Sequence, residues 1–268
     1  MFGFHNHTYY CEHAVNTPAE IIEEAIKRGF SSIGISEHYG KLETGEFITP
    51  KHSMTDPAAY FKECAEAKEV YQDKIDILIG VEMDFGPYNP SLLYKEILEY
   101  NPDYILGSVH LCEGFFYSRP YDYSDANIEK GIKIYLNKIL EMAESGFVNC
   151  LDHFDLYKKF VLLPDESIYY PYYEKIAKAL KEGDLAFEFN THFYEGAGVY
   201  VPDPNLYMLK LIRDYDIPVI VSSDSHKKED LSYNFEKAFK ILRDVGIKTT
   251  CRFKDRKVIK EPFLTGEI

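Results

Sequence analysis

The chain has 268 residues, of which 46% are hydrophobic and 28% charged, as in an ordinary globular protein with a sizeable core. Its 44 acidic and 30 basic residues give a net charge of -14, which argues against a nucleic-acid-binding surface. No apolar run approaches the roughly 18 residues of a membrane span and no secretory signal opens the chain, so we expect a cytoplasmic protein without membrane contacts.

Seven segments carry the signals of amphipathic helices. The clearest is 16–29, in which Thr17 is a candidate N-cap, Pro18 takes the first helical position, Glu20 completes a capping box and Gly29 marks the end. Similar patterns predict helices within 56–73, 89–100, 124–146, 165–183, 203–216 and 232–246.

Short apolar runs alternate with these helices and are typical of buried parallel strands. They occupy 1–7, 31–38, 75–85, 103–110, 148–155, 185–192 and 217–226. Seven repeats of strand and helix predict an α/β fold with a parallel sheet, either open or closed into a barrel. No linker interrupts the pattern, so we expect residues 1–268 to form a single domain.

Polar side chains gather where these runs end. His5 and His7 lie two apart on the first run, so both imidazoles point to the same side, and Asp224 and His226 repeat this spacing on the last run. The runs between them supply His38, Glu82, His110 and His153, and His13 follows the first run. In a barrel of parallel strands these ends form the rim on which active sites are built.

Imidazole nitrogens and carboxylate oxygens are ligands of zinc, iron and manganese. The five cysteines (Cys11, Cys64, Cys112, Cys150 and Cys251) include no CxxC pair, which argues against a disulfide framework and a zinc–thiolate cluster. The nine candidate donors suffice for two or three divalent cations. Such ions attract a phosphate group into an acidic protein and lower the pKa of bound water, which favours a hydrolytic enzyme.

The segments FHNHTYYCEH, GISEHYG, GVEMDF, GSVH, LDHFDLYKKF, EFNT and SSDSH, in this order, resemble the polymerase and histidinol phosphatase (PHP) superfamily, most closely its histidinol-phosphatase branch. The resemblance runs from Phe4 to about Gly246 and implies a distorted, TIM-like barrel of seven βα units with a trinuclear metal site. It implies one ion on His5, His7, Glu82 and Asp224, a second on Glu82, His110 and His153, and a third on His13, His38 and His226.

The resemblance also implies a metal-dependent phosphomonoesterase that converts L-histidinol phosphate to L-histidinol in histidine biosynthesis. Activated hydroxide would attack phosphorus in line, with Glu82, Asp224 and His226 as the expected catalytic residues. The leaving alcohol needs a proton, and Asp224 or His226 is the candidate donor, with His192 as the alternative.

The substrate-binding residues follow the family pattern less closely. Relatives carry a basic residue after the fifth strand, and Lys158 and Lys159 occupy that place. They carry another after the sixth strand, where this chain offers His192 and Glu195 instead. Asn190, at the end of that strand, is a candidate to orient the substrate or a ligand carboxylate. Arg119, after the fourth strand, is a candidate for the missing charge. His52, in an insertion after the second strand, is expected to be exposed to solvent.

Three other functions fit parts of this pattern. One is a PHP hydrolase of another small phosphate ester or nucleotide, favoured by the missing basic residue. A second is an amidohydrolase, since those barrels also open with HxH, but they bridge two metals with a modified lysine, and no lysine ends a strand here. The third is a metal-binding domain without catalysis. The sequence leaves the metal identity and the oligomeric state open.

Overall fold

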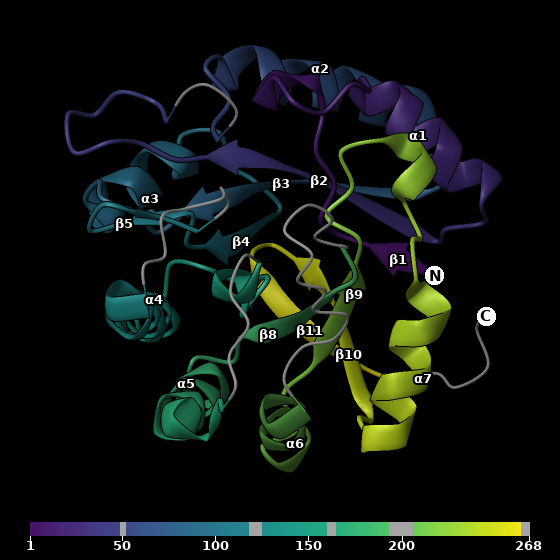
Figure 1. Cartoon of the computed structure of the whole chain (residues 1–268). Coiled ribbons are helices and arrows are strands. Elements are labelled where there is room, and N and C mark those ends of the chain that lie inside the picture. Colours follow the sequence, from purple (N-terminus) through teal and green to yellow (C-terminus); the bar gives the residue numbers. More distant parts are fainter. Residues whose placement is uncertain (49–51, 118–124, 160–164, 193–205, 264–268) are drawn as a thin grey trace.

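The computed structural model describes the chain except for residues 49–51, 118–124, 160–164, 193–205 and 264–268. Seven parallel strands form one sheet in the order β1-β2-β3-β4-β7-β8-β9 (Figure 1). Their bounds are β1 Phe2–Gly3, β2 Ser32–Tyr39, β3 Asp76–Asp84, β4 Tyr104–Ser108, β7 Cys150–Leu151, β8 Ala186–Asn190 and β9 Val219–Ser222. Each of the seven predicted runs overlaps one of these strands, and β2 extends one residue beyond its run.

The sheet curls into a nearly closed barrel. Its first and last strands meet just beyond their ends, where Asn6 forms an isolated parallel bridge with Ser225. The His7 amide donates to the Ser225 carbonyl at 2.8 Å, and the Ser225 amide donates to the His5 carbonyl at 3.3 Å. The predicted distorted barrel of seven βα units is therefore confirmed, and its last bridge lies among the candidate metal ligands.

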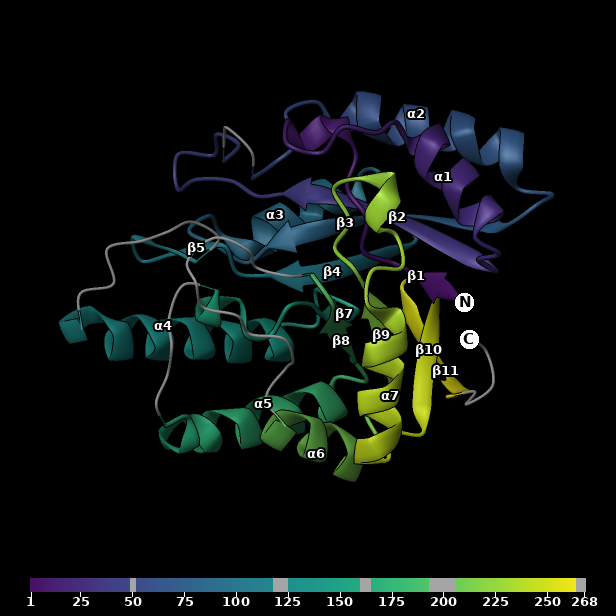
Figure 2. The same cartoon turned by 45° about the vertical axis from the view of Figure 1, so that its right-hand side comes forward.

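Helices cover the outside of the barrel (Figures 1 and 2). They are α1 Pro18–Lys27, α2 Pro57–Tyr71, α3 Pro90–Leu98, α4 Asp125–Glu144, α5 Tyr170–Glu182, α6 Leu206–Asp214 and α7 Phe235–Val245. The predicted capping box of α1 is present, because the Thr17 side chain accepts from the Glu20 amide and the Glu20 carboxylate accepts from the Thr17 amide. None of the described helices is both long and apolar enough to cross a membrane.

Two hairpins add to this pattern. The first, β5 Leu111–Cys112 with β6 Phe115–Phe116, lies between β4 and α4, and the second, β10 Thr249–Lys254 with β11 Lys257–Pro262, follows α7. The second hairpin covers the amino-terminal ends of the strands. Thr250 Oγ1 donates to the carbonyl of Val219 at 2.8 Å, and Asn149 Nδ2 donates to the carbonyl of Arg256 at 2.7 Å.

Aromatic rings fill the barrel below the metal ligands. Tyr104 is fully buried, donates to the Phe4 carbonyl at 2.5 Å and stacks on Phe253 of the second hairpin with ring centroids 5.0 Å apart. A Cβ atom at Gly80, on the neighbouring strand β3, would lie 2.5 Å from the Tyr104 ring. The ring therefore requires glycine at this position.

We expect Gly80→Ala to destabilise the fold by about 3 kcal/mol, because the Tyr104 ring is held on both sides and cannot move away from the added methyl group. Urea unfolding followed by circular dichroism measures this difference. The double variant with Tyr104→Leu should lose less stability than the two single changes added together. A Gly80→Ala protein as stable as the parent would contradict this packing.

Candidate metal centre

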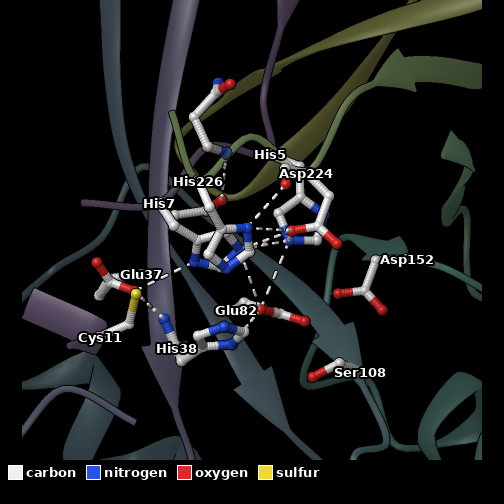
Figure 3. A network of polar contacts seen from close by, with 12 residues as sticks. His5, His7, Cys11, Glu37, His38, Glu82, Ser108, Asp152, Asp224 and His226 are labelled. Atoms are coloured by element: carbon white, nitrogen blue, oxygen red, sulfur yellow. Dashed lines mark hydrogen bonds and ion pairs between the residues drawn. The ribbon is translucent and has the colours of Figure 1, made fainter. Parts of the chain in front are cut away.

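Four donors from three separate strand ends form the centre of the cluster (Figure 3). The Nε2 atoms of His5 and His7 are 3.1 Å apart. Asp224 Oδ1 lies 3.0 Å from His7 Nε2 and 3.5 Å from His5 Nε2, and Glu82 Oε2 lies 3.5 Å from both nitrogens. The first pair follows β1, Glu82 is on β3 and Asp224 follows β9, so the barrel brings together residues more than 200 positions apart.

The Glu82 carboxylate faces two groups of histidines. Its Oε1 atom lies 2.9 Å from His153 Nε2 and 3.4 Å from His110 Nε2. Its Oε2 atom faces His5 and His7 and lies 2.5 Å from His38 Nδ1. This arrangement suits a carboxylate that bridges two cations.

A third group lies on the outer side of His7. The rings of His7 and His226 are 4.3 Å apart, as are those of His13 and His226, and the rings of His13 and His38 are 5.3 Å apart. His7, His38 and His226 offer nitrogen atoms within 4.8 Å of one another. All nine predicted donors therefore lie in one continuous cluster at the carboxyl ends of the strands.

Two buried carboxylates that we did not predict orient the first two histidines. Glu188 Oε1 lies 2.7 Å from His5 Nδ1, and Glu37 Oε1 lies 3.1 Å from His7 Nδ1. Each fixes its imidazole so that Nε2 faces the cluster, as carboxylates behind metal-bound histidines do. Asn190 Nδ2 donates to Glu188 Oε2 at 3.0 Å, so the Asn190 amide helps to hold the carboxylate that orients His5. The sequence offered one hint for each of these carboxylates, since both lie next to candidate site residues. Glu37 directly precedes His38, and Glu188 lies two residues before Asn190.

The electrostatics of the cluster favour a positive charge. Burial alone would raise the pKa of Glu82, but the imidazoles of His38, His110 and His5 hold it well below its ordinary range. Burial lowers the pKa of His7, yet hydrogen bonds to Asp224 and Glu37 raise it to about 9. The site therefore holds ionised carboxylates that attract a cation.

Buried polar atoms without a hydrogen-bond partner also indicate a cation site. Among the described residues, His38 Nε2 and His226 Nε2 are buried without a hydrogen-bond partner. Burial lowers the pKa of His226, and burial together with His38 lowers that of His13 to about 4, so both rings are neutral near pH 7. Neutral imidazoles and ionised carboxylates are the forms that bind metal, and the donor set fits divalent cations.

The two predicted lysines have different surroundings. Lys158 is buried, and its Nζ atom pairs with Glu166 Oε1 at 2.9 Å and with Asp155 Oδ2 at 3.4 Å. For Lys159, burial lowers the pKa and the charge of Asp224 raises it, so its ammonium group is within electrostatic range of Asp224. The two lysines thus differ in their charged surroundings, which are Asp155 and Glu166 for Lys158 and Asp224 for Lys159.

The remaining predicted residues lie at the edge of the site or outside the described part. The His192 ring is 6.1 Å from that of His226, and its pKa is lowered by burial, with an opposing effect of Asp224 and a further lowering by Lys159. Arg119 and Glu195 lie outside the described residues.

The expectation that His52 is exposed is wrong. Only 8% of this residue is exposed, and its ring lies 4.8 Å from that of Phe116, 5.8 Å from that of His110 and 6.3 Å from that of His38. The segment after β2 packs back against the first hairpin, which the polarity of that segment did not reveal. His52 is therefore part of the wall of the site.

Known proteins share this organisation. The family model of the PHP domain matches residues 3–192. A probable histidinol-phosphatase of Deinococcus radiodurans is 27% identical over 95% of this chain and 96% of its own. The histidinol-phosphatase of Lactococcus lactis is 25% identical over 96% of both chains. A crystal structure of the Lactococcus lactis histidinol phosphate phosphatase with zinc, L-histidinol and phosphate has the same fold, with a TM-score of 0.75 and 21% identity over 96% of this chain and 98% of that one. Since the family model covers well over half of the sequence, the chain belongs to the PHP domain family.

Proposed function

We propose that this chain is a metal-dependent phosphomonoesterase that hydrolyses L-histidinol phosphate to L-histidinol and phosphate. The observation that carries this proposal is the match over at least 95% of both chains to relatives named as histidinol-phosphatases. The cluster of imidazoles and carboxylates supports it, since such donors suit the cations that hydrolytic sites use. An enzyme of this biosynthetic step acts on a small molecule and would work in the cytoplasm.

The donor set accommodates two or three ions of zinc, iron or manganese within one domain. His5, His7, Glu82 and Asp224 would hold the first, Glu82, His110 and His153 the second, and His13, His38 and His226 the third. When bound, the cations neutralise the charge of the phosphate and lower the pKa of a bound water molecule. Glu188 and Glu37 keep the histidines of the first site in orientation.

The protein itself supplies charge and a proton at the edge of this cluster. We assign Lys159, within electrostatic range of Asp224, to the phosphate oxygens, because an ammonium group there offsets the dianion's charge. Asp224 is poorly suited to protonate the leaving oxygen, since its pKa is held well below the ordinary range despite its burial, by His5 and His7. His192 is the alternative donor because it is not one of the nine candidate metal ligands. Since burial lowers its pKa, its imidazole must take up a proton before it can donate one.

One observation favours a different substrate for the same chemistry. Residues 191–201 contain no lysine or arginine, although the family pattern has a basic residue there. A pocket with less positive charge would admit another small phosphate ester. The metal-dependent hydrolysis is common to both proposals, and only the group recognised beyond the phosphate differs.

The test is phosphate release from L-histidinol phosphate and from a panel of sugar, nucleotide and amino-acid phosphates, with the metal content of the same preparation measured. We expect kcat/KM for L-histidinol phosphate to exceed that for the panel by at least a hundredfold. Glu82→Ala protein, purified in the same way, serves as the blank for contaminating phosphatases. Equal rates across the panel would contradict the proposed substrate while keeping the phosphatase.

A further inference from the structure

Asp152 is a buried carboxylate at the cluster that none of the predicted roles uses. It follows β7 directly and precedes His153, and its amide donates to the Gly107 carbonyl at 3.1 Å. The residue is fully buried. In Figure 3 its carboxylate points toward Glu82 from the side opposite His38.

None of the described N–H groups donates to this carboxylate. Its Oδ1 atom lies 3.4 Å from His153 Nδ1, and the carboxyl group is within hydrogen-bonding range of the Glu82 carboxylate. Burial raises the pKa of Asp152, as do the neighbouring carboxylates of Glu82 and Glu188, whereas His5 lowers it. Two carboxyl groups this close together in a buried site are compatible as anions when a cation lies between them.

Three other buried carboxylates around the cluster each accept a hydrogen bond from a backbone amide. Glu37 accepts from the Thr8 amide at 2.9 Å, and Asp84 accepts from the His110 amide at 2.9 Å. Glu188 accepts from the His153 amide at 2.8 Å. Asp152 differs from these three because the described part of the chain offers it no donor, although it lies at the same strand ends.

We propose that Asp152 is a further metal ligand, which coordinates the ion held by Glu82, His110 and His153. This ion would otherwise have three protein ligands, and Asp152 supplies a fourth from the residue next to His153. A second carboxylate makes the donor set of this ion more anionic and holds the ion more tightly. The inference rests on the metal dependence of the proposed function and is independent of the substrate.

Asp152→Asn tests this, since it keeps the size of the side chain and removes its charge. After dialysis against buffered zinc or manganese, we expect the variant to lose one equivalent of metal, or to bind one ion at least tenfold more weakly by calorimetric titration. After chelation, the metal-free variant should unfold at or above the temperature of the metal-free parent, because the asparagine amide can donate to the neighbouring Glu82 carboxylate and carries no negative charge. The rise in unfolding temperature on adding metal should be smaller than in the parent.

Asp155→Asn is the matched control, because Asp155 lies three residues further on, is half-buried, and pairs with Lys158 Nζ at 3.4 Å. This change should lower stability equally with and without metal and leave the metal content unchanged. Full metal content and parental affinity in Asp152→Asn would overturn the proposal.

Should Asp152→Asn fail to fold, anomalous diffraction from zinc-loaded parent crystals decides the question. An Asp152 oxygen about 2.0–2.2 Å from an ion supports ligation, and a separation beyond about 3 Å overturns it. If the protein binds metal through Asp152 but prefers a different ester, the proposed substrate is contradicted and this inference stands.

Discussion

Glu82→Ala is expected to lower the turnover of the phosphate ester by more than a hundredfold while leaving the barrel folded. The Glu82 carboxylate faces His110 and His153 with one oxygen and His5, His7 and His38 with the other. Its loss would remove a ligand from two proposed ion sites at once. No remaining side chain could then hold the two ions at their proper separation. The fold should persist because the aromatic core below the cluster is unchanged.

The measurement is kcat at saturating metal, together with circular dichroism and metal content. Asp76→Ala is the matched control, since Asp76 is an exposed carboxylate at the opposite end of the same strand β3. We expect this control to retain the parental rate within about twofold and its full metal content. A Glu82→Ala enzyme with more than a tenth of the parental activity would contradict the shared-ligand arrangement.

The barrel was predictable because its elements are encoded locally. Helix starts such as Thr17 and Asn89 carry side chains that cap the first turn, and the apolar runs between helices have the length of buried strands. The hairpin β10–β11 was not predicted, although the alternation of buried Cys251 and Phe253 with exposed Arg252 and Lys254 was present. Its role depends on contacts with strand starts that are distant in the sequence.

The clustering of the nine candidate ligands was predictable because parallel strands bring their carboxyl ends to one rim. The supporting residues were not, since a glutamate beside a histidine can face solvent, the core or a ligand. Glu37 and Glu188 differ from an exposed glutamate only through burial and their hydrogen bonds to His7 and His5. His52 was wrongly predicted to be exposed, because the residues around it in the sequence are polar. In the fold this residue is buried.

The sequence could not tell which of the two lysines is within electrostatic range of the cluster, because they lie at the end of a 3-10 turn, Leu156–Lys158, in which neighbouring side chains diverge.

We expect Lys159→Met to lower kcat/KM for the phosphate ester by about 10- to 100-fold, the effect of losing roughly 1.5–3 kcal/mol of hydrogen bonding to a charged group. The loss should appear mainly in KM and in a weaker inhibition by inorganic phosphate, since the metal ligands are intact.

Lys158→Met provides the matched comparison. It leaves the carboxylates of Asp155 and Glu166 without their cation, so we expect a loss of stability of about 2 kcal/mol and kinetic constants within threefold of the parent. Steady-state kinetics and urea unfolding of both variants give the full comparison. A Lys158→Met enzyme with impaired phosphate binding beside a normal Lys159→Met enzyme would reverse the assignment, because the ion pairs of Lys158 would then have to open to admit the substrate.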